Sequence, residues 1–510
     1  HFYAKDLKTN KLLDKWIKNT FKNGYKWQIY DMVTSSSTGI KLWQTNTVNA
    51  QGSLLTASLG NGVSISNSYT VQGFPTLIKH DKASANIMSL NTVFEPKYGN
   101  LIGRNYTLIG NWTESITYDE FDRLKTFKDL AGLQEQLYNS NGTISSNTIG
   151  NYAYTESGQP YTLTSITPTD QSSSSQVINY YVNREQNISY NVFKSPVWIT
   201  EDNRENIDFE YNSNNSRSVM YYGDTQVSKN TRMMRKFYSE DGCMEIKRRT
   251  LGSSVTNDFV IYIGGDGYSA PIIVKGDGAT KNYFYLHRDY QGTIVAITNN
   301  QVTVVEKRLF DVWGSLIKYN YGTNATLPTS STSMFIDRGY TGHEHLLGVG
   351  LINMNGRIYD PKLHRFLQPD NNIQDPFNTQ NFNRYGYCMN NPTKYVDEDG
   401  EFWLFAAGFL FSAYIHGAQA TGNANPFQWN AGQWANALSS PISGLASTFT
   451  TNFANNYVDN YNQSREYNLN RGSVEDHSYA YHTLKSTWDE FKTHYLFINT
   501  TSNNTSASSS

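Results

Sequence analysis

The segment Ser115-Ile-Thr-Tyr-Asp-Glu-Phe-Asp-Arg-Leu-Lys125 carries the pattern on which the fold prediction rests. An aromatic residue and an aspartate are followed by a short polar turn, after which apolar residues return. In such a turn the aspartate side chain closes the loop, and the aromatic ring packs on a neighbouring hairpin. Degenerate copies occupy Ile207 to Arg217 and Arg308 to Leu316. Together, the copies predict an array of antiparallel hairpins.

The composition extends this expectation to most of the chain. Of the 510 residues, 37 are Tyr, 25 are Phe and 10 are Trp, and only 17% are charged, which favours strands. From about Tyr25 to Tyr319, short aromatic-rich runs are separated by Gly, Asn, Asp and Ser at the spacing of hairpins. Helical periodicity is largely absent, apart from the preceding segment Leu7 to Phe21. The mean hydropathy of −0.57 fits a hollow structure with two wetted faces and a polar solenoid equally well.

Charge, cysteines and apolar runs exclude several classes of protein. The net charge of −2 and the lack of a polybasic run argue against nucleic acid and anionic membranes as partners. Cys243 and Cys388 lie far apart and match no metal spacing, so we expect two buried free thiols. The apolar run Phe402 to Ile415 is too short for a transmembrane helix. The sequence begins at His1 without a signal-type apolar run, which indicates a processed product or part of a longer protein.

Several motifs resemble those of the Rhs/YD-repeat family. Tyr118-Asp-Glu-Phe-Asp-Arg-Leu124 resembles the YD repeat, and the stretch from about Tyr283 to Gly400 resembles the Rhs-associated core in the form common in Bacteroidota. A weaker repeat resemblance covers roughly Asn100 to Tyr283. The core match consists of Arg338-Gly-Tyr-Thr-Gly-His-Glu-His-Leu346, Gly350-Leu-Ile-Asn-Met-Asn-Gly-Arg-Ile-Tyr-Asp-Pro361, Arg365-Phe-Leu-Gln-Pro-Asp370, Asn383-Arg-Tyr-Gly-Tyr-Cys-Met-Asn-Asn-Pro392 and Tyr395-Val-Asp-Glu-Asp-Gly400.

This resemblance implies a mainly β fold, in which a spiralling antiparallel sheet of YD-type hairpins forms a hollow shell. It places a YD-repeat-like β-shell at residues 1–282, a core segment that plugs the shell at 283–401, and a variable, partly helical extension at 402–510. Such a chain is similar to the C component of the ABC/Tc toxin complexes. The resemblance implies a bacterial protein that is secreted or held at the cell surface. In many members an aspartyl protease within the chain cuts just after the core and leaves the C-terminal piece inside.

Asp370, Asp397 and Arg357 are the candidate catalytic residues. Two adjacent carboxylates can share a proton, so that one activates a water while the other donates to the substrate carbonyl. An adjacent arginine keeps one of them ionised. The resemblance places Asp370 and Asp397 on the family's protease pair and Arg357 on its arginine, with the cut near the bond between Glu401 and Phe402.

The chain departs from the family pattern next to Asp397. The family's cleavage motif reads Asp-Pro-x-Gly, whereas this chain has Asp397-Glu-Asp-Gly400. Proline would keep Asp397 extended and would fix its own φ. Glu398 lacks both effects and adds a carboxylate beside the pair. In the alternative interpretation, the candidate residues only cap turns and form ion pairs in the plug, together with Asp360.

The sequence predicts no cofactor and no metal ion. His343-Glu-His345, with His364 further along, could suggest a metal site. On a strand, however, His343 and His345 share a face without an assured third ligand. The same triplet belongs to the core string of the family, where it implies no metal.

The C-terminal extension has no motif that identifies an activity. Glu401 to Ala420 is typical of a short buried helix, and Ser473 to Phe497 of an amphipathic helix. His477, His482 and His494 match no catalytic arrangement. The extension is therefore either inert packing that anchors the chain in its shell or a small effector.

Three functions follow from these observations. The first is a secreted or surface shell protein that encloses or presents its C-terminal segment. The second is an autoprotease that delivers a small C-terminal toxin, and the third is a module for adhesion or partner docking. Because about 400 shell residues are few for a closed capsule, we expect a second YD-repeat subunit or a missing N-terminal part to complete it. Secretion machinery and surface adhesins are further candidate partners.

Overall fold

The computed structural model describes residues 2–5, 12–23, 25–32, 39–83, 85–168, 185–277, 280–330, 334–371, 373, 378–397, 400 and 403–405. The chain divides into two compact units, of which the first comprises residues 1–21, 26–47 and 54–411. This unit contains nearly all of the described strands. Among the described residues, no helix is both long and apolar enough to span a membrane.

Thirty-five strands form six antiparallel sheets in the described residues, and within each sheet every strand pairs with the next one in sequence. The first sheet holds β1 (Phe2–Lys5), β2 (Leu12–Lys22), β3 (Tyr25–Met32), β4 (Ile40–Val48), β5 (Leu54–Leu59), β6 (Ser64–Tyr69), β7 (Pro75–Lys82), β8 (Ala85–Phe94), β9 (Leu101–Leu108) and β10 (Gly110–Ser115). Two small sheets follow, with β11 (Thr117–Tyr118), β12 (Leu124–Asp129) and β13 (Gly132–Glu135), and then β14 (Leu137–Tyr138), β15 (Ile144–Asn147), β16 (Gly150–Ala153) and β17 (Ser165–Thr167).

The largest sheet has twelve strands and leads into the core segment. Its strands are β18 (Gln186–Tyr190), β19 (Pro196–Glu201), β20 (Asn206–Tyr211), β21 (Arg217–Tyr222), β22 (Met234–Tyr238), β23 (Met244–Leu251), β24 (Ser254–Ile263), β25 (Ile272–Gly276), β26 (Asn282–Arg288), β27 (Ile294–Asn299), β28 (Val304–Phe310) and β29 (Leu316–Tyr321). The core sheets hold β30 (Glu344–Leu346), β31 (Leu351–Met354), β32 (Arg357–Asp360) and β33 (Arg365–Phe366), and then β34 (Tyr395–Asp397) with β35 (Trp403–Phe405).

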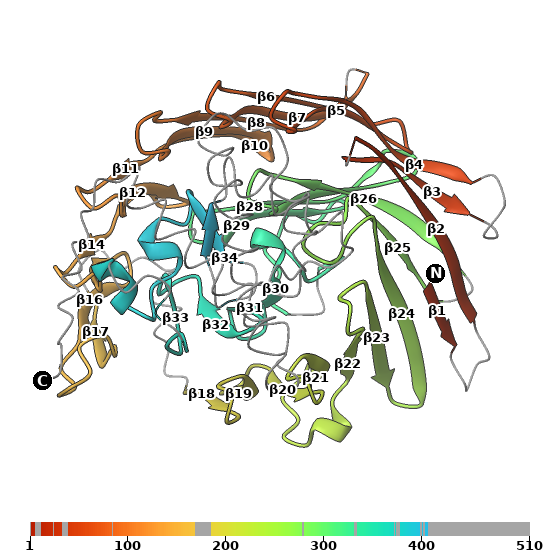
Figure 1. Ribbon diagram of the computed structural model, residues 1–510. Coiled ribbons are helices and arrows are strands. Elements are labelled where there is room, and N and C mark those ends of the chain that lie inside the picture. The colour runs from red at the N-terminus through yellow and green to blue at the C-terminus, as the bar shows by residue number, and fades with distance from the viewer. Residues whose placement is uncertain are drawn as a thin grey trace, which may run out of the picture. The chain divides into compact units, whose positions relative to one another are not determined.

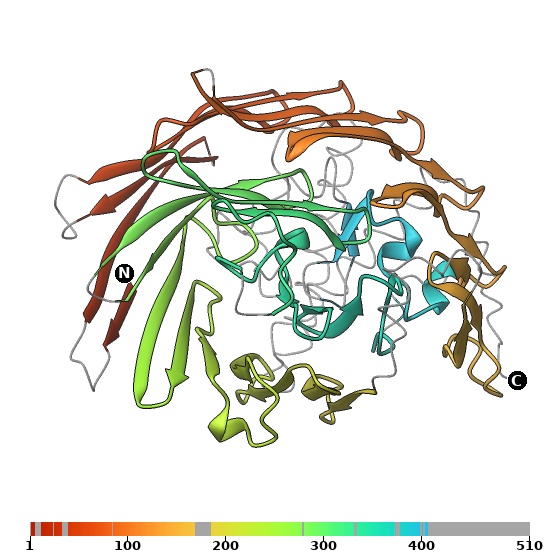
Figure 2. The same ribbon diagram turned by 180° about the vertical axis from the view of Figure 1, so that it is seen from behind.

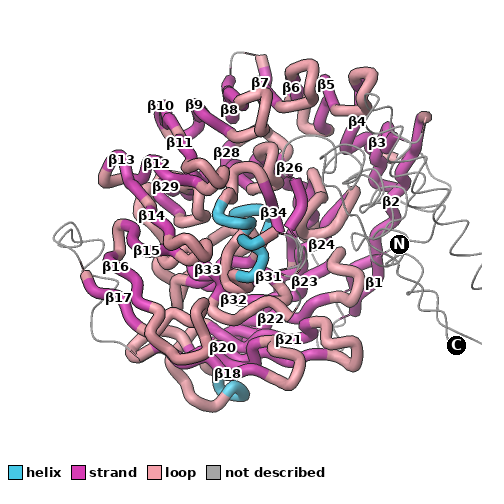
Figure 3. Tube along the Cα trace, turned by 60° about the vertical axis from the view of Figure 1, so that its left-hand side comes forward, coloured by secondary structure: helices cyan, strands magenta, loops and turns pink. Residues whose placement is uncertain are grey.

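The prediction of a mainly β fold of successive antiparallel hairpins is confirmed. Within the first unit, strands β1 to β25 follow one another round a circuit, strands β26 to β29 turn inward against β8 and β9, and the core strands β30 to β34 also lie inside it (Figures 1 and 2). Helix is limited to short 3₁₀ turns in the described residues, as Figure 3 makes visible.

Several hairpin turns are closed in the way that the sequence pattern predicts. The Oδ1 atom of Asp119 accepts hydrogen bonds from the backbone N–H groups of Phe121 and Arg123, both at 3.0 Å. Asp122, between them, adopts a left-handed φ of 60°. The same pair of bonds closes the turns that begin at Asn191, Asn212, Asp289, Asn299 and Asp311. The repeated aspartate or asparagine is therefore a turn-closing residue.

In five places a tyrosine at or just after the end of a strand forms a hydrogen bond to an earlier hairpin. Tyr118, the last residue of β11, donates its hydroxyl to the carbonyl of Leu101, the first residue of β9, at 2.8 Å. The same bond joins Tyr69 to Leu54, Tyr138 to Leu124, Tyr154 to Ile144 and Tyr211 to Pro196. In all five cases the acceptor is the residue that opens the strand after an earlier turn. These bonds satisfy buried hydroxyls and fix the stacking of neighbouring hairpins.

The first and the largest sheet face each other through one apolar cluster. Leu90 and Tyr106 of the first sheet belong to it, as do Phe259 and Tyr285 of the largest. The core segment contributes to the same cluster through residues such as Tyr359. Part of the space inside the circuit is therefore filled by packed side chains.

A buried pair of histidines crosses this interface. His80 Nδ1 of β7 lies 2.8 Å from His287 Nδ1 of β26, and His287 Nε2 lies 2.9 Å from Thr298 Oγ1. Since one ring nitrogen must donate and the other accept, at most one of the two Nδ1 atoms carries a proton. Burial lowers the pKa of His80 to about 4, although Asp81 opposes the shift. Burial, His80 and Lys307 hold the pKa of His287 well below its usual value.

We predict that acid weakens the packing of these two sheets. Both imidazoles take up a proton on unfolding near pH 6.5 but resist it when folded, so their stabilising effect is complete above that pH and is lost as the pH falls towards 4. The free energy of unfolding should fall by about 1.4 kcal/mol per pH unit for each histidine in this window. Urea unfolding between pH 7 and pH 5 measures the slope. The variant His287→Gln should reduce it, and a slope that the variant leaves unchanged would contradict the assignment.

A second buried cluster fastens the core segment to the largest sheet. The Lys236 Nζ atom of β22 lies 2.5 Å from Glu344 Oε1, 2.7 Å from Glu245 Oε2 and 3.3 Å from Asp337 Oδ1. The Lys236 side chain is fully buried. Arg338 of the core segment in turn pairs with Glu245 at 2.8 Å. The charges are thus arranged so that each carboxylate meets at least one cation.

Two helix predictions are wrong in the residues that the structure describes. Residues 12–21 of the segment Leu7 to Phe21 belong to strand β2, because pairing with its neighbours in the sheet supplies the backbone bonds that a helix would otherwise make. Trp403 to Phe405, within the segment Glu401 to Ala420, form strand β35. The rest of that segment and Ser473 to Phe497 lie outside the described residues.

Candidate functional site

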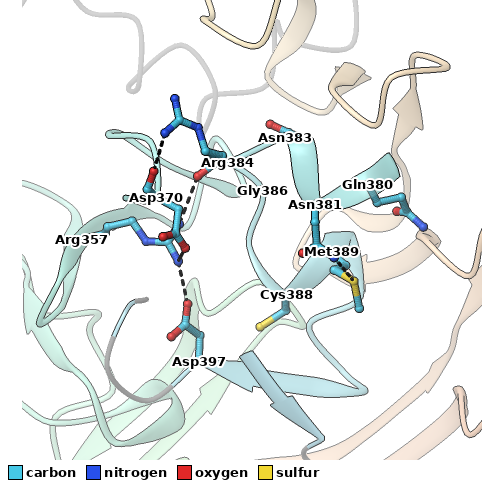
Figure 4. A pocket seen from close by; sticks show the side chains of 10 residues that line it. All are labelled: Arg357, Asp370, Gln380, Asn381, Asn383, Arg384, Gly386, Cys388, Met389 and Asp397. Carbon is cyan, nitrogen blue, oxygen red and sulfur yellow. Dashed lines mark hydrogen bonds and ion pairs between the residues drawn. The ribbon is translucent and has the colours of Figure 1, made fainter. Parts of the chain in front are cut away.

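The three candidate catalytic residues come from separate elements of the core segment. Arg357 is the first residue of β32, Asp370 lies four residues after β33, and Asp397 ends β34. The turn between β31 and β32, the strand β33 and the strand β34 bring their side chains together, as Figure 4 shows. Each is at least 95% buried, so the charges face one another rather than solvent.

Arg357 lies between the two carboxylates. Its Nη2 atom is 3.2 Å from Asp370 Oδ2 and 2.9 Å from Asp397 Oδ2. Because both oxygens contact the same nitrogen, they lie within roughly 6 Å of one another. The guanidinium stacks on the ring of Phe366, with its carbon 3.6 Å from the ring centroid. Arginine suits this place because its planar fork can bridge two acceptors and stack at the same time.

The remaining donors of Arg357 hold the backbone on both sides of the pair. Its Nη1 atom donates to the carbonyl of Arg384 at 3.1 Å, and its Nε atom donates to the carbonyl of Gly400. The Asp370 N–H donates to the Arg384 carbonyl at 2.8 Å, and the Arg384 Nη1 donates to the Asp370 carbonyl at 3.0 Å. The positions of Asp370 and Asp397 are therefore fixed through one shared set of bonds.

Gly400 is required where the chain leaves the site. Its φ is +74°, and a Cβ atom there would meet the Met354 carbonyl oxygen at 2.0 Å. Beyond it, Trp403 pairs with Asp397 across the β34–β35 hairpin. Gly400 and Trp403 thus hold the backbone next to the carboxylates on both sides of the predicted cut. Glu398, Glu401 and Phe402 themselves lie outside the described residues.

A small pocket opens beside the carboxylates and is also lined by Asn383, Arg384, Cys388 and Met389 (Figure 4). Burial raises the pKa of the Cys388 thiol well above its usual value, and the charge of Asp397 raises it further. The thiol is therefore neutral and is no nucleophile. Cys388, Met389 and Asn390 all have left-handed φ angles, of 49°, 50° and 61°. Such strain persists only where the surroundings hold it in place.

Sequence reasoning missed two parts of this arrangement. Nothing in the local sequence indicates that the carbonyls of Gly400 and Arg384 would face Arg357, because both contacts depend on long-range packing. Cys388 was expected only as a buried thiol, and its place beside Asp397 has no sequence signal. Both thiols are free, with Cys388 buried and Cys243 half-buried.

The His343-Glu-His345 triplet serves other partners. His343 Nδ1 lies 2.8 Å from Thr341 Oγ1, and His345 Nε2 accepts from the Tyr340 N–H at 3.0 Å. Glu344 belongs to the ionic cluster of Lys236. Within the described ranges, no group of three His, Cys, Asp or Glu side chains could hold a metal ion.

Residues 271–393 match the Teneurin YD-shell family. This part of the chain is similar to a YD shell. A solved TcdB2-TccC3 complex has the same fold, with a TM-score of 0.58 over 78% of this chain and 23% of that one, at 16% identity. The Photorhabdus luminescens Tc holotoxin pore is similar, with a TM-score of 0.57 over 78% of this chain and 22% of that one, at 16% identity. The expected relationship to the Rhs/YD-repeat proteins is confirmed.

Curated relatives of the YD shell are much longer proteins. The tRNA nuclease WapA of Bacillus subtilis is 24% identical over 322 residues, which are 57% of this chain and 12% of WapA. Salivary gland surface protein 1 of Aedes aegypti is 28% identical over 200 residues, which are 38% of this chain and 5% of that protein. The chain thus matches only a small share of the length of each relative.

Proposed function

We propose that this chain is a secreted or surface-held bacterial shell protein that encloses its C-terminal segment, residues 402–510. The observation that supports it is the place of the core segment. Strands β30 to β34 lie inside the circuit of hairpins, and the chain continues from them into the C-terminal segment (Figure 1). The likeness to TcdB2-TccC3 and to a protein named as a tRNA nuclease is in keeping with a shell that carries cargo.

Limited proteolysis of the full chain tests the enclosure. An enclosed segment is digested only when the sheets open, so peptides from residues 402–510 should appear at the same urea concentration at which the sheets unfold. Mass spectrometry of timed digests measures both events. Phe193 lies in a hairpin turn and is 64% exposed to solvent. This turn is the control site, because it should be cut without urea. Digestion of 402–510 at zero urea, with the sheets intact, would show that the segment is presented outside the shell.

The chain also has the residues for cutting itself, and one observation favours this second function. Arg357 contacts Asp370, Asp397 and the Gly400 carbonyl at once, and Gly400 immediately precedes Glu401, at which we propose the cut. A carboxylate pair with one shared proton can activate water and donate to a peptide carbonyl. The wild-type chain should then yield a fragment of about 109 residues under denaturing conditions, and a single intact mass after prolonged incubation would end this proposal.

We further propose that a second YD-repeat subunit, or a part of a longer chain, completes the shell. Among the described strands, β1, β17, β18 and β29 each end a sheet. Unpaired sheet edges are sites at which another chain adds a strand. The chain also spans only 23% of the TcdB2-TccC3 chain that it matches. Secretion machinery and surface adhesins stay predicted partners for delivery to the cell surface.

A further inference from the structure

The segment that carries Asp397 into the site is seated on the tips of three hairpin turns. Asn391 is 1% exposed, and its Nδ2 atom donates to the Asp122 carbonyl at 2.7 Å and to Asn100 Oδ1 at 2.9 Å. Asn100 Nδ2 in turn donates to Asp122 Oδ1 at 2.8 Å. Gln380 Nε2 donates to the carbonyl of Phe121 in the same turn at 3.1 Å. The turn at residues 119–123 therefore supplies two carbonyls and a carboxylate as hydrogen-bond acceptors to this network.

A second hairpin turn, at residues 139–143, is bound in the same way. Asn383 Nδ2 and Asn390 Nδ2 both donate to the carbonyl of Gly142, each at 3.0 Å. Gly142 is the left-handed residue of the turn that starts at Asn139, with a φ of 83°. Its carbonyl takes this direction because the turn is closed. The amide side chains thus bind groups that are in place only in folded turns.

A third turn holds the residues just before β34. Gln291 Nε2 donates to the Pro392 carbonyl at 2.5 Å, and the Tyr290 hydroxyl donates to the Thr393 carbonyl at 2.8 Å. The Tyr118 hydroxyl lies 2.6 Å from Thr393 Oγ1. Thr393 is two residues before β34 and four before Asp397. The hairpin turns at residues 119–123, 139–143 and 289–293 therefore fix the position of the segment that leads into β34. This strand carries Asp397, a candidate catalytic carboxylate.

We infer that Asn391, with the neighbouring amides, is a positioning residue that makes the cleavage site depend on folded YD turns. This inference rests on the proposed self-cleavage and concerns its regulation. The left-handed run Cys388 to Asn390 is strained, and the bonds to the turn tips hold it. Without these bonds the run relaxes, β34 shifts and Asp397 leaves Arg357. Because the site needs these bonds, the chain is cut only after the hairpins around its C-terminal segment have folded.

A double-mutant cycle tests the coupling between turn and site. Asp119→Ala opens the turn at residues 119–123, and Asn391→Ala removes the side chain that binds its carbonyl. Each single variant should slow cleavage by about tenfold, and the double variant should be no slower than the slower single one, because both changes remove the same contact. Asp119→Asn keeps the turn-closing oxygen while losing the ion pair with Arg123, so it should restore the rate.

The turn that begins at Asn212 supplies the matched control. It is closed by the same two bonds, and its described contacts are with other parts of the wall. Asn212→Ala should leave the cleavage rate within about twofold of wild type, and its effect should add to that of Asn391→Ala. An Asp119→Ala chain that is cut at the wild-type rate, or additive effects of Asp119→Ala and Asn391→Ala, would overturn the inference.

Amide hydrogen exchange separates this inference from the proposed self-cleavage. In Asp119→Ala and Asn391→Ala, the amides of residues 388–397 should exchange about tenfold faster than in Asn212→Ala. Should the wild-type chain stay intact, faster exchange in these two variants alone would still support the coupling, while the cleavage proposal fails. Unchanged exchange would overturn the coupling whether or not the chain is cut.

Discussion

Replacing Asp370 with asparagine is expected to leave the chain in one piece. The wild-type chain should separate under denaturing conditions into a shell fragment and a fragment of about 109 residues. Asparagine keeps the shape of the side chain but can neither carry the negative charge nor take up a proton, so the general acid–base step is lost. Such a loss slows a reaction by about 100-fold to 10,000-fold. The measurement is the intact mass of purified chains after timed incubation.

A neighbouring carboxylate controls for general damage to the core. Asp360 ends the strand that begins with Arg357, and its Oδ1 accepts bonds from the backbone N–H groups of Lys362 and Leu363 at 2.8 and 3.0 Å. Asp360→Asn keeps these two bonds and should be cut at close to the wild-type rate. Equal loss of cleavage in Asp360→Asn and Asp370→Asn would show that the core had been disturbed, and continued cleavage of Asp370→Asn would remove Asp370 from the mechanism.

The largest loss of stability is expected for Lys236→Met. The methionine fills a similar volume, but Asp337, Glu245 and Glu344 lose the cation that they share. An ion pair broken on one side leaves buried charge uncompensated, which costs about 3–5 kcal/mol. Each carboxylate keeps a second cation, because Arg338 contacts Glu245, Arg217 contacts Glu344 and Lys247 contacts Asp337. We therefore expect the loss to lie at the lower end of this range, about 3 kcal/mol. Urea unfolding at pH 7 measures the change, and the core segment should detach first.

An exposed lysine on the neighbouring turn is the control for Lys236. Lys229 lies 2.6 Å from Glu210, but the two side chains are 41% and 39% exposed. Exposed ion pairs contribute about 0–1 kcal/mol, so Lys229→Met should change the free energy of unfolding by less than that. A loss in Lys236→Met no larger than in Lys229→Met would show that the buried cluster does not fasten the core to the sheet.

Turn closure could be predicted from sequence because it is local. Asp119 acts on the N–H groups two and four residues ahead, and the pattern of residues is enough to recognise it. The partner of Tyr118 could not be predicted in the same way, since Leu101 becomes its acceptor only through the register of the neighbouring strands. The segment Leu7 to Phe21 was misread for a related reason: its apolar spacing suits a helix, but pairing with other strands decides its conformation.

The site residues were predicted from a family resemblance rather than from geometry. The sequence strings that hold Arg357, Asp370 and Asp397 pointed to them, and the structure brings the three together. Their roles stay predictions. The contact of Asn391 with Asp122 joins residues 269 positions apart, and asparagine occurs throughout this chain, so no local pattern singles it out.

The backbone carbonyls that the repeat tyrosines bind all precede them in the chain. Each of the five hydroxyls donates to a carbonyl 10 to 17 residues earlier, and Tyr118 also contacts Thr393 further along the chain. During synthesis, each new hairpin leaving the ribosome therefore meets a docking point that has already been made. At roughly 5–20 residues per second, one such link can form on the order of every second of translation. Neighbouring hairpins can therefore join in chain order during synthesis, while the apolar face of the first sheet is covered only when the largest sheet and the core segment have followed.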